Sequence, residues 1–549
     1  MWSFQGSSYQ WGENIIQEIS ARFSQPNLMG GPTPKGMGGG IPVVAFWTDK
    51  VGIGIGHLEL RPLALSLPVT VGSGNRVEAS TELEPGVILK PGESYSLPRS
   101  FISVYEGDFF KPLPIYSRAL QCEGWDIPNP GKQAYNSSWS SWGYKQNFTR
   151  AQVLGTIPKL KEFGIRWATL DYRWFNNFGD WEPRQDTFPD DTLKQLAEEF
   201  HKQGFYIQIW WQPLAVDDGL GRHMNRKQTV VSKVAQEHPD WLILDKAGRH
   251  ARLVSPVCDI ASLCPGLPEA QKYFVRLSQR FIRQWGFHGS KMDSVFSAPP
   301  CYNPKHNHKS PQESILAIPK VMQAIFETSR SLKTYSVTQI CPCGAPPNFA
   351  WLPYMNQAVT ADPVGCIQVR RPIKMYKVLL GPHAAVSGDH VELTKVLFAN
   401  TDREIDVGED LASTVGAGGV VGAKFVWPDA GPDFKSVYLT PAKEKIWKKW
   451  MDIYNREVLS NGTFLDLYNY GYDFPEAYAI RKDGKMYYAF YAPNPPALWR
   501  GEVQLRGLDP GRYHVYDYEN QKDLGIVDAS NPRLKTRFNY HLLLQVSKV

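Results

Sequence analysis

The stretch PEAQKYFVRLSQRFIRQWGFHGSKMD, residues 268–293, contains one complete helix-to-strand unit and decides the fold. Pro268 suits the first turn of a helix, where its missing N–H costs nothing. Gly286 is a typical helix terminator, and FHGSKMD (287–293) follows it as a short strand. Between them, five apolar residues recur at helical spacing: Tyr273, Phe274, Leu277, Phe281 and Trp285. An amphipathic helix that leads directly into a strand is the repeating unit of parallel α/β folds.

The same alternation continues in both directions, from about residue 133 to residue 430. Helical patterns cover 192–203 and 311–331. The candidate strands are 134–139, 166–171, 205–210, 287–293, 335–340, 357–361, 383–387 and 420–427. Eight strands that alternate with helices over about 300 residues is the count of a (β/α)8 TIM barrel. We therefore predict a multidomain α/β and β protein whose central barrel spans residues 126–435.

Strand patterns without long helices flank the predicted barrel on both sides. Residues 1–125 are punctuated by Pro-Gly turns and predict an N-terminal β-sandwich-like region. Residues 436–549 predict a C-terminal antiparallel β-sandwich, with a hairpin turn at Asp483-Gly484.

The net charge and the hydropathy pattern argue against nucleic acids and membranes as partners. The net charge of +6 comes from 60 basic and 54 acidic residues without a basic block, so we expect no nucleic-acid partner. No apolar run approaches the roughly 18 residues of a membrane helix, so we expect no membrane partner. The first residues, MWSFQGSSYQ, lack a basic-then-apolar leader. We expect a cytoplasmic protein, or one whose leader is absent from this chain.

The aromatic and cysteine counts are informative in different ways. The 18 Trp residues and the 13% aromatic content are typical of carbohydrate enzymes, although large cores would also explain them. Seven Cys residues cannot all pair in disulfides. Zinc could be imagined at Cys341 and Cys343 together with Cys258, Cys264, His306 and His308, but no set has the C-x2-C spacing of a structural site. We therefore expect neither a metal site nor a cofactor.

Ionisable residues at the predicted strand ends suggest where chemistry occurs, since barrel enzymes react at the carboxyl ends of their strands. Lys291 and Asp293 share one face of their strand, because side chains alternate. Asp362 follows the strand at 357–361. Two carboxylates that face one pocket are what glycoside hydrolysis requires. A structural Lys–Asp pair and an Asp that opens a turn before Pro363 are the alternative interpretations.

Two further strand ends combine polar and aromatic residues. One carries Asp171 and Trp174, and the next carries Trp210. A polar group beside an aromatic face suits a sugar ring, so we predict that these residues bind substrate. The alternative is that the Trp side chains only cover the mouth of the barrel.

Taken together, the short motifs around these residues resemble glycoside hydrolase family 36, the retaining α-galactosidases. The motifs occur in the same order as in the family, and the chain resembles a divergent member of it. The motifs are DYRWF at 171–175, GDW at 179–181, FP at 188–189, IWWQP at 209–213, HPDW at 238–241, KMD at 291–293, CPCG at 341–344 and TAD at 360–362.

The resemblance implies an exo-α-glycosidase that releases terminal α-linked galactose from an oligosaccharide or glycoconjugate by double displacement. Asp293 would be the nucleophile, and Asp362 would be the acid and then the base. The other implied substrate contacts are Lys291 beside the nucleophile, Cys341 and Gly344 near O2, Asp171 near O4 or O6, Trp210 as a wall, and Arg252 from before the fourth strand.

The chain also departs from the family pattern. Tyr172 replaces the second residue of an Asp-Asp pair, Gln212 replaces a Glu, and Ala345-Pro346-Pro347 replaces a glycine run. An α-N-acetylgalactosaminidase, a transglycosylase resembling raffinose synthases and a non-catalytic sugar-binding barrel therefore stay as alternatives. Family members often form tetramers through the N-terminal β region, which is shorter here, so a homo-oligomer is one expected state.

Overall fold

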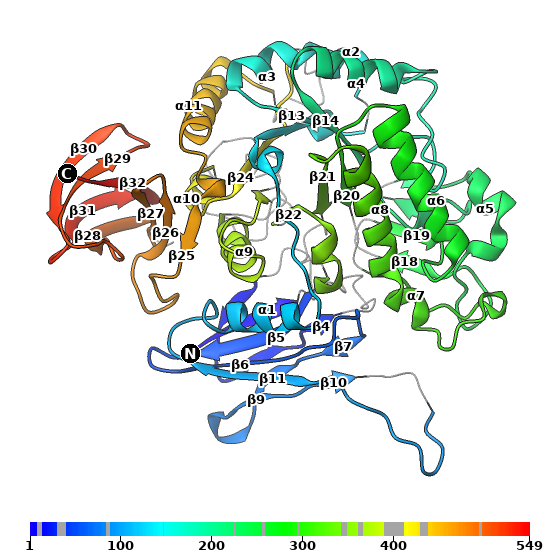
Figure 1. Cartoon of the computed structure of the whole chain (residues 1–549), viewed down its shortest axis with the longest axis horizontal. Helices are drawn as coiled ribbons and strands as arrows, with labels where there is room; N and C mark the ends of the chain where they lie inside the picture. Colours follow the sequence, from blue (N-terminus) through cyan, green and yellow to red (C-terminus); the bar gives the residue numbers. More distant parts are fainter. Residues whose placement is uncertain are drawn as a thin grey trace.

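The computed structural model contains a central barrel with antiparallel sheets on two sides (Figure 1). It describes residues 1–7, 14–29, 40–83, 88–146, 148–223, 226–254, 258–293, 297–341, 348–360, 366–388, 411–428, 438–493 and 497–549. Within these ranges no helix is both long and apolar enough to cross a membrane.

Eight parallel strands close into the predicted barrel. They are β12 (Ser138–Ser140), β13 (Trp167–Leu170), β14 (Tyr206–Trp211), β20 (Gly289–Asp293), β21 (Val337–Cys341), β22 (Gln357–Val359), β23 (Val386–Gly388) and β24 (Val420–Ala423). Each lies at or within a few residues of its predicted position. In the register of β20 and β21, Lys291 is paired with Gln339 and Asp293 with Cys341.

The barrel helices follow the predicted patterns, with two local differences. Helix α4 (Thr192–Lys202) matches its prediction, whereas α6 (Pro268–Gln279) continues as a π-helical turn over Arg280–Gln284. The pattern at 311–331 divides into α7 (Glu313–Leu316) and α8 (Ile318–Leu332). Pro319 lies in the first turn of α8, where a new helix accepts a proline and a continuous helix would not.

The N-terminal region contains a five-stranded sheet in the order β11-β6-β5-β1-β2. Its strands are β1 (Trp2–Ser7), β2 (Ile16–Glu18), β5 (Gly40–Trp47), β6 (Gly52–His57) and β11 (Ser100–Tyr105). The prediction of an all-β region was wrong for α1 (Pro112–Cys122), which lies between this sheet and the barrel (Figure 1). The Tyr116 hydroxyl donates to the carbonyl of His57 at 2.7 Å, which ties α1 to β6.

The C-terminal region differs from the prediction at its start. Helix α11 (Pro441–Glu457) occupies the first part of the predicted β domain and packs on the barrel helix α3 (Ile157–Phe163). The antiparallel sheets begin at β25 (Thr463–Leu465). The hairpin at Asp483-Gly484 is confirmed: it joins β26 (Glu476–Lys482) to β27 (Lys485–Tyr491). The antiparallel strands of this region thus follow α11, and the domain boundary at residue 436 stays a prediction.

A small antiparallel sheet interrupts the barrel between β14 and α6. It is formed by β15 (Ala215–Val216), β16 (Arg222–His223), β17 (Arg226–Lys227), β18 (Arg252–Val254) and β19 (Cys258–Ser262). This excursion follows the carboxyl end of β14, where loops of a barrel enzyme surround the reaction site.

Candidate active site

Asp293 lies at the carboxyl end of β20, where its side chain is partly exposed. The indole Nε1 of Trp210, at the end of the neighbouring strand β14, donates a hydrogen bond of 2.8 Å to its Oδ2. Trp210 itself is 2% exposed. One carboxylate oxygen is thus fixed by a buried donor on the adjacent strand.

Lys291, two residues before Asp293 on β20, forms a buried ion pair with Asp171, which directly follows β13. Lys291 Nζ lies 3.5 Å from Asp171 Oδ2, and both side chains are 5% exposed. The Ser140 hydroxyl donates to the same oxygen at 2.8 Å, and the Tyr172 amide donates to Oδ1 at 2.8 Å. Lys291 and Asp171, predicted separately at two strand ends, therefore meet in one polar cluster inside the barrel.

Cys341 ends β21 and is buried, directly beside Asp293 in the strand register. The structure thus places the predicted O2-side thiol on the strand next to the predicted nucleophile. Asp362 and Gly344 lie outside the described residues, so their predicted roles stay predictions.

Trp174 occupies a different environment from the sugar-facing one predicted. Its side chain is fully buried, and its Nε1 donates to the carbonyl of Trp210 at 2.7 Å. It packs in a cluster of rings: Phe175, Trp181, Phe281 and Trp285. In this position it supports Trp210 from behind and presents no open face to a ligand.

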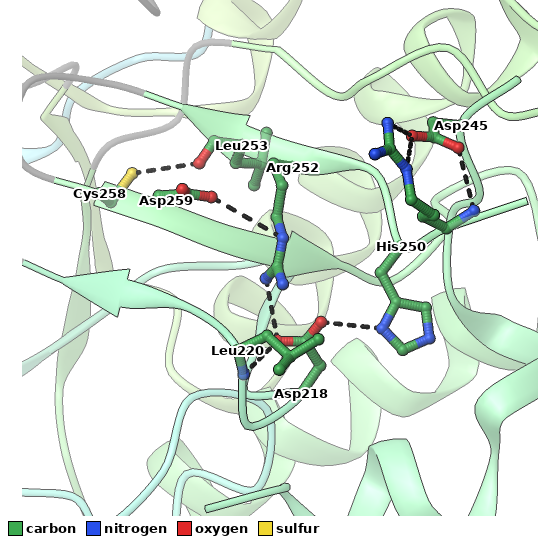
Figure 2. A network of polar contacts seen from close by, with 9 residues as sticks. Asp218, Leu220, Asp245, His250, Arg252, Leu253, Cys258 and Asp259 are labelled. Atoms are coloured by element: carbon green, nitrogen blue, oxygen red, sulfur yellow. Dashed lines mark hydrogen bonds and ion pairs between the residues drawn. The ribbon is translucent and has the colours of Figure 1, made fainter. Parts of the chain in front are cut away.

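Arg252 is held by carboxylates of the excursion sheet (Figure 2). Its Nη1 donates to Asp218 Oδ1 at 2.9 Å, and its Nε lies 3.8 Å from Asp259 Oδ1. His250 Nδ1 contacts the other oxygen of Asp218 at 2.8 Å. Burial alone raises the pKa of Asp218, but the hydrogen bonds from His250, Arg252 and the Leu220 amide outweigh it and lower that pKa.

A second polar group on this rim was missed by the sequence reasoning. Burial raises the pKa of Asp217 to about 7, although the Phe178 amide donates to its Oδ2 at 2.8 Å. Burial, with Arg173 and Arg222 nearby, lowers the pKa of His223 to about 3. Neither ring nitrogen of His223 has a hydrogen-bond partner among the described residues. The adjacent acids at 217–218, just past a barrel strand, were the available signal.

Tyr172, which stands in place of a family carboxylate, is buried against this group. Its ring centroid lies 5.2 Å from that of Trp210 and 4.7 Å from that of His223. Burial raises the pKa of its hydroxyl above the usual value. The side chain is therefore a neutral aromatic wall where the family pattern has a charge.

A group of four side chains outside the polar cluster has the geometry of a metal site, contrary to the expectation from the sequence. Cys264, Cys301, His306 and His308 place one ligand atom each within 4.8 Å of one another. The sequence pattern suggested Cys258, Cys341 and Cys343 and omitted Cys301, whereas the group in the described residues contains Cys301 and none of those three. The four donors come from two segments about 40 residues apart, so spacing alone did not reveal them.

Comparisons with known proteins agree with this architecture. The Melibiase family model matches residues 135–408. A protein of Flavonifractor plautii described as an A type blood α-D-galactosamine galactosaminidase is 31% identical over the whole of this chain. The chain spans 48% of that relative's length.

Solved structures share the fold at low identity. A glycoside hydrolase family 36 α-galactosidase of Geobacillus stearothermophilus, in complex with raffinose, has a TM-score of 0.68 at 16% identity. An α-galactosidase of Lactobacillus brevis has a TM-score of 0.68 at 17% identity. Both matches cover 100% of this chain, with 75% and 74% of the respective structures. With its closed barrel and its match to the family model, the chain belongs to the Melibiase family and is a divergent relative of the family 36 α-galactosidases.

Proposed function

We propose that this protein is a retaining exo-α-glycosidase that removes a terminal α-linked sugar of galactose configuration, with Asp293 as its nucleophile. The observation that carries the proposal is the position of Asp293. It is a partly exposed carboxylate at the carboxyl end of a barrel strand, oriented by the indole of Trp210 at 2.8 Å. A nucleophile must be both accessible and fixed in direction, and this residue is both.

The proposed reaction has two displacements. In the first, a carboxylate oxygen of Asp293 attacks C1, the bond from C1 to the leaving oxygen breaks, and Asp362 gives that oxygen a proton. The product is a β-linked glycosyl-enzyme. In the second, Asp362 takes a proton from water, the water oxygen attacks C1, and the ester bond to Asp293 breaks. The sugar leaves with its α-configuration retained.

The buried polar cluster supplies groups for sugar hydroxyls. Lys291 offers N–H donors and Asp171 offers acceptors, and each is oriented by the other at 3.5 Å. Trp210 and Cys341 border the nucleophile from the two neighbouring strands. Trp174 and Arg252 act through other residues in this proposal: Trp174 positions Trp210, and Arg252 positions Asp218.

A galactosaminide is a second candidate substrate. The relative that matches the whole chain is described as acting on α-D-galactosamine, although this chain spans about half of it. Tyr172 also removes one carboxylate from the pair that the family motif provides, which changes how O4 and O6 are recognised. The two candidates share the same chemistry at C1 and differ only in the substituent at C2.

A panel of 4-nitrophenyl α-glycosides tests the proposal and separates the two sugars. We expect release of nitrophenol from the α-galactoside, the α-galactosaminide or the α-N-acetylgalactosaminide, with little release from the α-glucoside. Asp293→Asn should abolish turnover without changing the melting temperature. Asp191→Asn is the matched control, because Asp191 is an exposed Asp on the same barrel without a side-chain cap hydrogen bond. Hydrolysis of none of these glycosides, or full activity of Asp293→Asn, would contradict the proposal.

A further inference from the structure

Two cysteines and two histidines meet where the excursion contacts the segment between β20 and α7. Cys264 follows β19 of the excursion, and Cys301, His306 and His308 lie in the segment between β20 and α7. Cys264 Sγ lies 3.2 Å from His308 Nε2, and Cys301 Sγ lies 3.1 Å from His306 Nδ1. All four ligand atoms lie within 4.8 Å of one another. With usual Zn–S and Zn–N bond lengths, the donors of a tetrahedral zinc site are about 3.3–3.8 Å apart. The two Cys–His contacts are close to that separation, and the 4.8 Å limit places all four donors near one ion position.

In each histidine, one ring nitrogen contacts an oxygen outside the group, which leaves the other ring nitrogen facing a cysteine. His306 Nε2 donates to the carbonyl of Asp240 at 2.5 Å, which leaves Nδ1 facing Cys301. His308 Nδ1 lies 3.3 Å from a carboxylate oxygen of Glu313, which leaves Nε2 facing Cys264. Metal-binding histidines generally donate their other ring N–H to a carbonyl or a carboxylate, and here one histidine does each.

The backbone around the cysteines also fits a thiolate site. The amides of Gly266 and Asn303, each two residues past a cysteine, donate toward the sulfur atoms of Cys264 and Cys301. A Cβ on Gly266 would lie 2.6 Å from Cε1 of His308, so only glycine lets this turn approach the ring so closely. The backbone therefore packs closely against both cysteines and against the ring of His308.

We propose that Cys264, Cys301, His306 and His308 bind one structural Zn²⁺. Two thiolates and two imidazoles are the donor set that selects zinc, and four protein ligands close a tetrahedral site. A closed site has no position for water or substrate, so the ion would stabilise the fold and take no part in the sugar chemistry.

The position of the site indicates which parts of the chain the ion would hold together. The segment that begins eight residues after Asp293 is already bound to the chain before β18 through the Tyr302 amide and the Leu244 carbonyl, at 2.9 Å. Asn303 Nδ2 adds a hydrogen bond of 3.0 Å to the Leu242 carbonyl. Zinc would add a link from the same segment to Cys264, which follows β19, and so fix residues 301–308 against the excursion sheet. This inference does not depend on the identity of the sugar.

Metal analysis of the full chain, purified without a metal-affinity resin and dialysed against metal-free buffer, tests the proposal. We expect about one zinc per chain. Cys301→Ser should reduce the zinc content by about tenfold or more. Cys258→Ser is the matched control, since Cys258 is a buried cysteine of the same sheet outside the cluster, and it should keep its zinc.

Cobalt provides a second readout that does not require a folded variant. Chelator-stripped wild-type protein titrated with Co²⁺ should develop the visible absorption of tetrahedral thiolate-bound cobalt, and Zn²⁺ should displace it and raise the melting temperature. Three results would overturn the proposal: a stripped protein that gives no cobalt absorption, equal zinc loss in Cys258→Ser and Cys301→Ser, or a Cys264–Cys301 disulfide in the native protein.

Discussion

At the scale of single residues, the indole of Trp210 is the contact that most directly controls Asp293. The hydrogen bond of 2.8 Å runs between neighbouring strands, and Trp174 holds the backbone of Trp210 from behind at 2.7 Å. A buried hydrogen bond to a charged group contributes about 1.5–3 kcal/mol. Loss of this donor should therefore affect turnover far more than folding.

We predict that Trp210→Phe lowers kcat by about tenfold, because about 1.4 kcal/mol corresponds to one decade in rate. Trp211→Phe is the matched control: it removes an adjacent indole whose N–H has no hydrogen-bond partner among the described residues. Steady-state kinetics on the best aryl glycoside measures both variants. An equal loss of kcat in the two would show that the hydrogen bond to Asp293 has no special part.

Asp217 and His223 give opposite pH dependences of stability. Asp217 has a folded pKa of about 7 against an ordinary value of 3.8, so its unfolded form ionises first and stability falls as pH rises between these values. His223 has a folded pKa of about 3 against 6.5, so its unfolded form takes up a proton first and stability falls as pH drops through that window.

The Asp217→Asn variant should separate these two effects. An amide can still accept the Phe178 N–H but cannot ionise. The free energy of unfolding of the variant relative to wild type should therefore rise steadily from pH 4 to pH 7, by up to about 1.4 kcal/mol per pH unit. Urea unfolding at pH 4, 5, 6 and 7 measures this difference. A difference that is constant with pH would mean that Asp217 is ionised in the folded protein.

At the scale of elements, strands such as β14 and β20 could be predicted because each is a short apolar run after a helical stripe that ends at glycine, at Gly204 and Gly286. The small sheet between β14 and α6 could not, because its strands span two to five residues and carry no periodic pattern. Helices α1 and α11 were missed for another reason: they lie in segments whose neighbours are strand-rich, and the surrounding pattern was extended over them.

The same contrast explains the candidate site. Lys291 and Asp293 could be placed on one face because side chains alternate along a strand. Asp171 and Trp210 could be singled out because each lies at the end of a predicted strand, whereas Cys341 came from the family resemblance alone. The four donors near Cys264 could not, since their meeting depends on how the excursion folds back on the segment after β20. The spacing of these residues along the sequence does not indicate that contact.

The turn of the β26–β27 hairpin tests whether a left-handed backbone conformation requires glycine there. Asp483 and Gly484 have φ values of 47° and 72°, the left-handed conformation that a tight hairpin turn requires. A Cβ on Gly484 would meet nothing within 4 Å, so only backbone strain opposes a side chain there.

We predict that Gly484→Ala lowers the free energy of unfolding by about 1 kcal/mol. Gly155→Ala is the control. Gly155 ends α2 (Arg150–Gly155), and a Cβ there would make an ordinary contact of 3.4 Å with Pro428. The control should be neutral or slightly stabilising in chemical denaturation. Equal effects of the two alanines would contradict the left-handed turn.

At the scale of the whole molecule, helix α9 (Cys366–Leu379) connects the barrel to both β regions through buried ion pairs. Lys374 Nζ lies 2.5 Å from Asp108 Oδ2, on the N-terminal side. Arg370 donates two hydrogen bonds to Glu476 on the C-terminal side, of 2.9 and 3.0 Å. The same helix thus fixes the position of both β regions against the barrel.

We predict that Glu476→Gln lowers the free energy of unfolding by about 3 kcal/mol at pH 7, because it leaves Arg370 buried without its counter-charge. Burial opposes ionisation of Glu476, but Arg370 and Arg371 lower its pKa from 4.5 to about 2. The stabilisation is therefore present above pH 4.5 and disappears as pH falls toward 2, so the deficit should shrink near pH 3.

Lys448→Met is the control for this variant, since Lys448 pairs with Asp452 on an exposed helix surface. Exposed pairs contribute little, and we expect a change within about 0.5 kcal/mol. Thermal and urea unfolding at pH 7 and pH 3 measure both variants. A Glu476→Gln deficit as small as that of the control would mean that the ion pair does not couple the C-terminal region to the barrel.

The central claim is that Asp293 forms the covalent bond to C1, and rescue of a truncated nucleophile tests it most directly. Asp293→Gly removes the carboxylate, so added azide can attack C1 of an activated α-glycoside from the side that Asp293 occupied. We predict negligible activity without azide, recovery of turnover with increasing azide, and a β-glycosyl azide as the product identified by NMR. An α-glycosyl azide, or wild-type hydrolysis by Asp293→Gly without azide, would contradict the assignment of Asp293 as the nucleophile.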